Sequence, residues 1–233
     1  MAGTKITWLG HAGFRIVSPE GKVILIDPWF EGNPLAPFGV NDLKEADLLL
    51  VTHDHFDHSG DAALIAINTG ATIVGMPETM RRLCDEEGVP ESQIVLGTGM
   101  NIGGTYREDG IEITMVQAFH SSQTGAPAGY IVRMEDEFTI YHAGDTGIFG
   151  SMQIWGELFD IDLALLPIGS VFTMDPLQAA MAAKLLRAKR VIPMHYKTFP
   201  VLVQDAASFE EALAEIVPEA EAVVAEVGRE MLF

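Results

Sequence analysis

A short segment, VTHDHFDHSGD at residues 51–61, carries three histidines and three aspartates in eleven positions. Imidazoles and carboxylates are the side chains that bind zinc and related divalent metals in proteins. The segment directly follows an apolar run at residues 47–51 that is typical of a buried strand. The dense H-x-H-x-D-H spacing therefore indicates a metal centre at the point where a strand ends.

Four residues of this segment are candidate ligands, and no regular element would bring them together. On a helix, His53 and His55 would point in nearly opposite directions, because two residues turn through about 200°. On a straight strand, His58 would face away from His53, His55 and Asp57. We therefore expect a curled loop, with a helix that starts near Ser59. The remaining aspartates, Asp54 and Asp61, are expected to be loop and helix-start residues.

Further candidate groups follow other apolar runs of the chain. They sit at or just beyond the ends of six separate expected strands: His11, Asp27, His53, His120, Asp145 and His195. Sites in open α/β structures are built in the crevice outside the carboxyl ends of strands. The common position of these residues therefore predicts one composite site.

The candidate ligands outnumber those that one tetrahedral zinc needs. They divide into two sets and a bridge: His53, His55 and His120 for one ion, Asp57, His58 and His195 for a second ion, and Asp145 between them. Two ions roughly 3.5–4 Å apart would deprotonate a shared water near neutral pH and make it the nucleophile. The pattern thus predicts hydrolytic chemistry.

Three more residues would support this chemistry. Asp27 is expected to accept a hydrogen bond from a metal-bound imidazole, or else simply to begin the Asp-Pro-Trp turn. His11 and His142 would either polarise the substrate or donate a proton to the leaving group, or else have a structural role. For His142, its position three residues before Asp145 favours a supporting role. The predicted catalytic residues are Asp57, Asp145, His142 and His11.

For several neighbouring residues the sequence leaves two roles open. Lys197 would meet an anionic substrate group or lie in solvent, and Ser121 and Ser122 would line the pocket or cap their loop. The irregular segment 28–39, which holds three aromatic residues, would form a pocket wall or a subunit interface. Cys84 is expected to pack within a helix.

Composition narrows the class of protein. The 233 residues are 48% apolar and 20% charged and contain no low-complexity linker, which predicts a single domain, residues 1–233. A net charge of −19 weighs against nucleic-acid binding. No apolar stretch is long enough to insert into a membrane, and the single cysteine and the amino-terminal sequence favour the cytoplasm. A homo-oligomer is left open.

The hydrophobic runs predict strands that mix hairpins with strand–helix alternation, which favours an α/β fold, a four-layer αββα sandwich. The expected strands are 4–9, 13–17, 22–26, 47–51, 71–75, 111–118, 130–134, 137–142, 161–166, 190–194 and 222–225. The expected helices are 61–68, 78–87, 175–188 and 206–216. The helix at 175–188 should begin at the cap Asp175 and bury a stripe of Leu177, Ala180, Met181 and Leu185.

Several segments together resemble the metallo-β-lactamase superfamily. THDHFDHSGD is similar to its metal-binding signature, AFHSS, HAGDTG and VIPMHY to its later ligand segments, and LGHAGF and LIDPW extend the similarity through nearly the whole chain. The resemblance is to the small metal-dependent hydrolases related to ascorbate-phosphate lactonases and N-acyl-phosphatidylethanolamine phospholipases D. It implies an αββα sandwich, a dinuclear site with a bridging hydroxide, and the same seven ligands.

The expected function is hydrolysis of a small or medium-sized ester, lactone or phosphodiester. The cofactors would be two divalent metal ions, with zinc favoured over manganese, iron or nickel. Two other classes remain open: a di-iron redox protein and a non-catalytic, metal-stabilised binding module. Flavodiiron proteins have a glutamate at the position of His55 and an attached flavin domain, and both differences weigh against the redox class. The chain length weighs against the RNA-processing nucleases.

Overall fold

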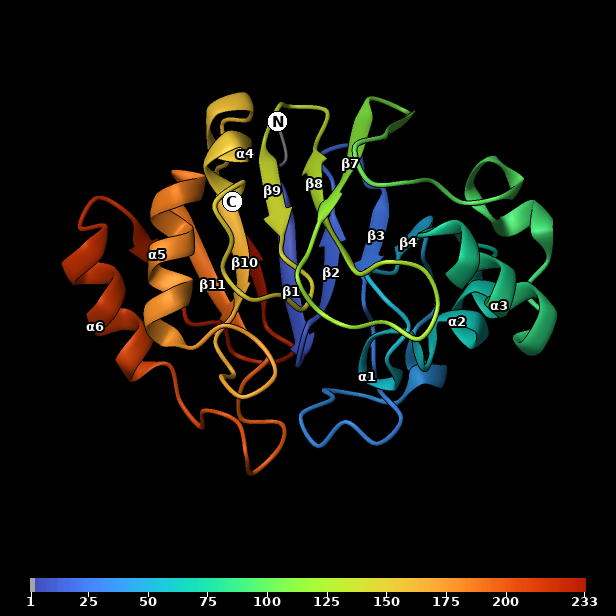
Figure 1. Cartoon of the computed structure of the whole chain (residues 1–233). Coiled ribbons are helices and arrows are strands. Elements are labelled where there is room, and N and C mark those ends of the chain that lie inside the picture. The colour runs from blue at the N-terminus through green and yellow to red at the C-terminus, as the bar shows by residue number, and fades with distance from the viewer. Residues whose placement is uncertain (1–2) are drawn as a thin grey trace.

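Two mixed β-sheets lie face to face in the computed structural model, which describes residues 3–233 (Figure 1). The first sheet has the order β13-β1-β2-β3-β4-β5. Its strands are β1 (Lys5–Gly10), β2 (Gly13–Val17), β3 (Val23–Ile26), β4 (Leu48–Leu50), β5 (Thr72–Val74) and β13 (Glu230–Leu232).

The second sheet has the order β12-β11-β10-β9-β8-β7-β6. Its strands are β6 (Thr105–Glu108), β7 (Ile111–Gln117), β8 (Ala128–Arg133), β9 (Thr139–His142), β10 (Leu163–Pro167), β11 (Arg190–Met194) and β12 (Glu221–Ala222).

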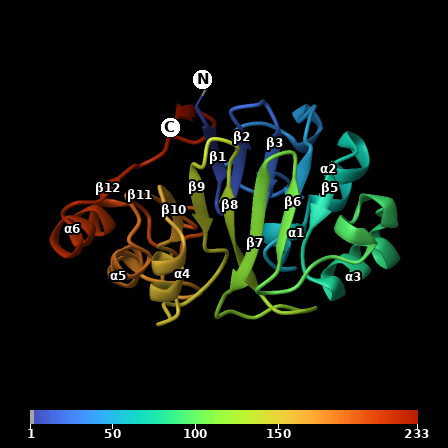
Figure 2. The ribbon, with the colours of Figure 1, turned by 90° about the horizontal axis from the view of Figure 1, so that it is seen from above.

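The helices form two groups on either side of the strands (Figures 1 and 2). One group is α1 (Phe56–Ser59), α2 (Ala62–Thr69) and α3 (Pro77–Glu87), and the other is α4 (Met152–Leu158), α5 (Pro176–Leu186) and α6 (Ala207–Ile216). Sheets in the middle and helices outside make the predicted αββα sandwich, which is confirmed.

Alternation along the strands explains the layers. In β3, Ile24 and Ile26 belong to the core between the sheets, whereas Leu25 belongs to the core beneath α2 and α3. Successive side chains of a strand point to opposite faces, so an uninterrupted apolar run such as VILI buries both faces of its sheet.

Strand direction determines where the site forms. The strands β3, β4 and β5 are parallel, and so are β9 to β12. Two successive antiparallel pairings, through β2 and through β8, make β1 run in the same direction as β3 and β7 in the same direction as β9. The carboxyl ends of β1, β3, β4, β7, β9 and β11 therefore meet at one edge of the sandwich, the lower edge in Figure 1. The predicted site residues follow these six strands.

The helix at 176–186 buries a different face from the predicted one. Asp175 caps it as expected, accepting a hydrogen bond from the Gln178 main-chain nitrogen at 2.8 Å. However, Leu177 is 62% exposed and Met181 39% exposed, whereas the buried face consists of Ala179, Ala180, Ala182, Ala183 and Leu186. The helix contacts α4, α6 and β10, and small side chains permit that close packing. The predicted stripe was wrong at Leu177 and Met181, whereas Ala180 is buried and Leu185 is partly buried against the core.

Four short elements were not predicted: α1, α4, β6 and β13. The strand β6 reads TYRE and β13 reads EML, and neither contains an apolar run. Both are edge strands of their sheets, where half of the pairing surface faces solvent.

Candidate metal centre

The site begins in the loop that leaves β4. The nitrogens His53 Nε2 and His55 Nδ1 lie 2.9 Å apart, and His120, from the loop after β7, completes a cluster with them. Burial, together with the neighbouring His58, lowers the pKa of His53 well below its ordinary value. Burial also lowers the pKa of His120. Neutral imidazoles offer lone pairs, so this cluster could hold a cation.

A second cluster is built on the one-turn helix α1. Asp57 and His58 lie in this turn and gather with His195, which follows β11, and with His11, which follows β1. The helix begins at Phe56, so the expectation of a loop up to Ser59 was wrong. The turn explains how adjacent residues 57 and 58 face the same group of side chains in space.

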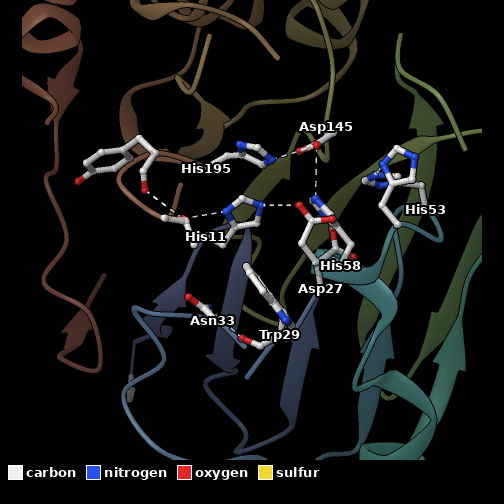
Figure 3. A network of polar contacts seen from close by, with 12 residues as sticks. His11, Asp27, Trp29, Asn33, His53, His58, Asp145 and His195 are labelled. Carbon is white, nitrogen blue, oxygen red and sulfur yellow. Dashed lines mark hydrogen bonds and ion pairs between the residues drawn. The ribbon is translucent and has the colours of Figure 1, made fainter. Parts of the chain in front are cut away.

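Asp145 lies between the two clusters (Figure 3). Its Oδ2 atom is 3.1 Å from His195 Nε2, 3.4 Å from His58 Nε2 and 3.5 Å from His120 Nε2. One carboxylate oxygen therefore approaches imidazoles from both sets. A cation on either side would find Asp145 within reach.

The charges at the centre of the site suit a cation. Burial alone would raise the pKa of Asp145, but His195 and His58 outweigh it and hold that pKa well below its ordinary value. Burial alone would lower the pKa of His58, but the carboxylates of Asp145 and Asp27 raise it well above its ordinary value. The carboxylates of Asp145 and Asp27 therefore favour positive charge at this point of the site.

Two buried atoms at this point have no hydrogen-bond partner within the described chain: His58 Nε2 and Asp145 Oδ1. Buried polar atoms are almost always paired, so two unpaired ones on neighbouring side chains of the site are available to a ligand. A divalent metal would displace the proton from His58 and accept both atoms. The donor set, imidazoles with carboxylates, fits such an ion.

Asp27 orients His58 from behind. Its Oδ2 accepts hydrogen bonds from His58 Nδ1 at 2.7 Å and Thr52 Oγ1 at 2.5 Å, and its Oδ1 accepts from the Thr52 main-chain nitrogen at 2.8 Å. Although Asp27 lies close enough to His53 and His58 to be grouped with them, these donors occupy both its oxygens. These hydrogen bonds fix the orientation of the His58 ring, whose other nitrogen, Nε2, faces Asp145. Asp27 thus makes the contacts that we expected of a carboxylate supporting a metal-bound imidazole.

His11 holds Asp57 rather than facing open space (Figure 3). Its Nε2 lies 3.0 Å from Asp57 Oδ2 and its Nδ1 lies 2.8 Å from Thr198 Oγ1. Burial lowers the pKa of His11 to about 4, against the opposing effect of the hydrogen bond to Asp57. The neutral ring thus connects Asp57 with the hydroxyl of Thr198, which itself donates a hydrogen bond to the Tyr196 carbonyl at 3.2 Å, and these contacts make His11 a positioning residue.

His142 does not face the clusters. The ring is fully buried, donates Nε2–H to the Ala12 carbonyl at 2.9 Å and accepts at Nδ1 from the Gly144 main-chain nitrogen at 3.1 Å. Both ring nitrogens are used by the main chain, so the geometry does not support the catalytic role predicted for His142. The contact instead fixes the β1–β2 turn next to the turn that carries Asp145.

Three site residues share an uncommon backbone conformation. His11, Asp27 and His195 have φ values of 53°, 44° and 56°. Positive φ is uncommon for residues other than glycine and concentrates at functional sites. Here it turns the side chain back over the sheet edge directly after a strand, which places these groups in the clusters.

The sequence analysis missed the role of Asp54, between the two histidines of the first cluster. Its buried carboxylate accepts hydrogen bonds from Ser122 Oγ at 2.8 Å, from the Gln123 and Thr124 main-chain nitrogens at 2.6 and 2.7 Å, and from the Thr124 hydroxyl. Burial would raise the pKa of Asp54, but these hydrogen bonds lower it. Asp54 thereby ties the His53–His55 loop to the loop that follows His120. The polar run SSQT was the only signal in the sequence.

Asp61 holds the segment 28–39 in a similar way. It is the N-cap residue at the start of α2, as expected, but its side chain makes no capping bond; its Oδ2 accepts from the main-chain nitrogens of Phe30 at 2.6 Å and Glu31 at 3.0 Å. The segment packs Trp29 against His11, with ring centroids 5.3 Å apart. It therefore supports the site from behind instead of lining it.

The two clusters open into a cavity of about 500 Å³. Candidate ligands line one side of it: His55, Asp57, His120, Asp145 and His195. Ser121 lines it too, whereas Ser122 is bound to Asp54. Lys197 is exposed and lies outside the lining, which favours the alternative that it lies in solvent over contact with an anionic substrate group.

Known proteins share this architecture. A family model described as a beta-lactamase superfamily domain matches residues 22–196. A UPF0173 metal-dependent hydrolase of Nitratidesulfovibrio vulgaris is 55% identical over 216 residues, 93% of this chain and 90% of the relative. Another of Pyrobaculum islandicum is 51% identical over 215 residues, 91% of this chain and 92% of the relative. The structure of Igni18, a metallo hydrolase from Ignicoccus hospitalis, has a TM-score of 0.89 at 40% identity and covers 99% of this chain and 98% of that chain.

A four-layer sandwich with imidazole and carboxylate clusters at one edge defines a class of metal-dependent hydrolases. The chain belongs to the metallo-β-lactamase superfamily, in the family of the two metal-dependent hydrolases just described, and the resemblance seen in the sequence is confirmed. Among residues 3–233, no helix combines the length and the apolarity needed to cross a membrane. Cytoplasmic location, the lack of nucleic-acid binding and the oligomeric state stay predictions.

Proposed function

We propose that this protein is a hydrolase with a dinuclear metal centre that acts on a small or medium-sized ester, lactone or phosphodiester. The observation that carries the proposal is the position of Asp145 Oδ2, which lies 3.1–3.5 Å from imidazole nitrogens of both clusters. The first ion would be held by His53, His55 and His120, the second by Asp57, His58 and His195, with Asp145 shared.

When bound, two such ions would supply a bridging hydroxide near neutral pH and polarise the substrate oxygen. The protein itself supplies orientation. Asp27 fixes the ring of His58 through Nδ1, and His11 fixes Asp57 through Oδ2. Residues held in this way lose little free energy to reorganisation during the reaction.

Zinc is our preferred metal. Neutral histidines with carboxylates are its usual ligands, and a catalytic zinc keeps an open position for water or substrate. Manganese, iron and nickel accept the same donors, so the ligand chemistry alone does not exclude them. The cavity of about 500 Å³ is of a size that encloses small molecules, which supports a small substrate.

The proposal is tested with Asp57→Ala and a metal-reconstituted activity screen. Purified wild-type protein is loaded with zinc, manganese, iron or nickel and offered lactones, thioesters, phosphodiesters and β-lactams. We expect about two metal ions per wild-type chain, metal-dependent turnover, and loss of both turnover and one ion in the variant, with an unchanged circular dichroism spectrum.

Asp85→Ala is the matched control, because Asp85 is an exposed aspartate on α3 outside the site. It should keep metal content and turnover. Full activity in Asp57→Ala would overturn the proposed mechanism. Two bound irons with a visible absorption band and no hydrolysis would favour the redox class, and chelator-sensitive stability without any turnover would favour a binding module.

A further inference from the structure

Part of the lining of the cavity at the metal centre is apolar. Besides the candidate ligands, four apolar side chains form this apolar wall: Phe56, Phe172, Phe199 and Val201. They come from α1, from the loop after β10 and from the loop after β11. A molecule bound at the ligands therefore lies in the same cavity as these side chains.

Three of these apolar side chains are open to solvent. Phe56 is 64% exposed, Phe172 57% and Val201 55%. Exposed apolar side chains gathered at a concave site mark a binding surface, because covering them stabilises the complex by about 25 cal/mol per Å². Their position around the reactive groups identifies the substrate as the molecule that covers them.

Two side chains of the apolar wall, Phe56 and Phe199, pack against the buried ring of Trp29. The ring of Trp29 lies edge-on to Phe56 at 5.6 Å and stacks on Phe199 at 5.8 Å between centroids. Trp29 itself is only 3% exposed, and Asn33 Nδ2 donates a hydrogen bond to its carbonyl at 2.9 Å. A wall that is in place before the substrate arrives loses little conformational entropy on binding.

The cavity offers no positive side chain to a substrate. Within residues 3–233 its lining contains no lysine or arginine, and the polar residues other than candidate ligands are Ser121 and Gln123. The net charge of −19 adds no attraction for anions. A charged group on the substrate away from the reacting bond would therefore lose its hydration without gaining a partner.

On these observations we propose that the substrate carries a neutral apolar group, an alkyl chain or a ring, which packs on Phe56, Phe172, Phe199 and Val201 while the scissile bond lies over the candidate ligands. This inference rests on the proposed function and narrows its substrate class. It makes Phe172 and Val201 specificity-determining residues.

The test compares methyl acetate, methyl butyrate and methyl hexanoate with the zinc-loaded protein, followed by proton release. Methyl esters are used because an aromatic leaving group would itself occupy the apolar wall. Each added methylene that is fully buried should raise kcat/KM roughly fourfold. We expect kcat/KM to rise at least about tenfold from acetate to hexanoate in the wild type, and the ratio of the two values to be smaller in Phe172→Ala.

Val171→Ala is the matched control, because Val171 precedes Phe172 in the same loop, is 64% exposed and does not line the cavity. It should keep the preference for the longer chain. A chain-length profile that is flat or falling in the wild type, or equal in Phe172→Ala and the wild type, would overturn the inference.

A binding measurement separates this inference from the proposed function. Calorimetric titration with sodium acetate and sodium hexanoate should show tighter binding of hexanoate to the wild type and a smaller difference in Phe172→Ala. This result is expected even if no ester in the screen is hydrolysed, in which case the hydrolase proposal fails and the apolar subsite stands. Equal binding of the two carboxylates would overturn the subsite.

Discussion

The carboxylate of Asp54 lies 2.7 Å from the main-chain nitrogen of Thr124, seventy residues further along the chain. This contact joins the loop of His53 and His55 to the loop of His120. The three histidines of the first cluster are therefore held together by an aspartate whose oxygens accept hydrogen bonds from residues 122–124. Their spacing depends on this connection as much as on the strands that precede them.

Replacing Asp54 by asparagine should weaken the first cluster. An amide would place N–H groups against the N–H donors of the 122–124 loop, and the lost charge-assisted hydrogen bonds are worth roughly 1.5–3 kcal/mol each. We expect about 2 kcal/mol lower free energy of unfolding and loss of one metal ion during dialysis. Urea denaturation and metal analysis would measure both effects.

Ser122→Ala serves as the comparison for that variant. It removes a single neutral donor, the hydroxyl 2.8 Å from Asp54 Oδ1, and leaves the carboxylate and its main-chain donors in place. Its effect on unfolding should be about 1 kcal/mol or less. Equal metal retention in Asp54→Asn and the wild type would show that Asp54 does not organise the cluster.

Asp27→Asn should lower metal affinity without disturbing the fold. Asparagine tolerates the φ of 44° at this position, but it lacks the charge that holds His58 Nδ1–H. Loss of such a supporting carboxylate costs 10–100-fold in metal affinity as a rough range. Competition with a chromophoric chelator would measure the change, and Thr52→Val, which keeps the carboxylate, should show a smaller one. An unchanged affinity in Asp27→Asn would contradict this role.

Much of the site could be predicted from the sequence because apolar runs show where strands end. Apolar runs place His120, Asp145 and His195 directly after strands, and strand direction brings those ends to one edge. The grouping into two clusters follows from counting ligands against the needs of a tetrahedral ion. Ligands that are far apart in the sequence still come together, because the pairing of strands in the sheets brings the strand ends close to one another.

Other features depended on three-dimensional packing that the sequence does not encode locally. Hydrophobicity ranks Leu177 above Ala179, yet the leucine is exposed and the alanine buried, because α5 lies too close to its neighbours for bulky side chains. The partners of Asp54 depend on the path of the loop after His120. His142 was named among the catalytic residues, with a supporting role favoured by its position three residues before Asp145, whereas only the backbone geometry around it reveals its structural bonds.

Metal removal should destabilise the protein. Chelation would leave His58 and Asp145 as a buried pair without the cation that their unpaired atoms call for. A metal present at 100 times its dissociation constant stabilises the folded state by about 2.7 kcal/mol. Thermal unfolding with EDTA and after zinc addition should differ by several degrees in the wild type and by much less in His195→Gln. Identical unfolding curves for the wild type in both conditions would contradict metal binding.

Alkaline stability should depend on two buried phenols. Burial raises the pKa of Tyr141 above its ordinary value, and it raises that of Tyr130 with a further contribution from Asp27. Because the folded pKa lies above the unfolded value of about 10, the stabilisation is fully present below pH 10 and is lost as the pH rises beyond it. The free energy of unfolding should therefore fall between about pH 10 and pH 11, and less steeply in Tyr141→Phe.

At neutral pH the two tyrosines should respond in opposite ways to replacement by phenylalanine. The Tyr141 hydroxyl has no partner in the described chain, so its removal should leave stability unchanged or raise it. The Tyr130 hydroxyl donates to the carbonyls of Val51 at 2.7 Å and Val74 at 3.1 Å. Its loss leaves the buried Val51 carbonyl unpaired and should cost about 1–3 kcal/mol in urea denaturation at pH 7. If Tyr141→Phe were instead the more damaging variant, the Tyr141 hydroxyl would have to bind a buried water, since only a bonded hydroxyl is costly to remove.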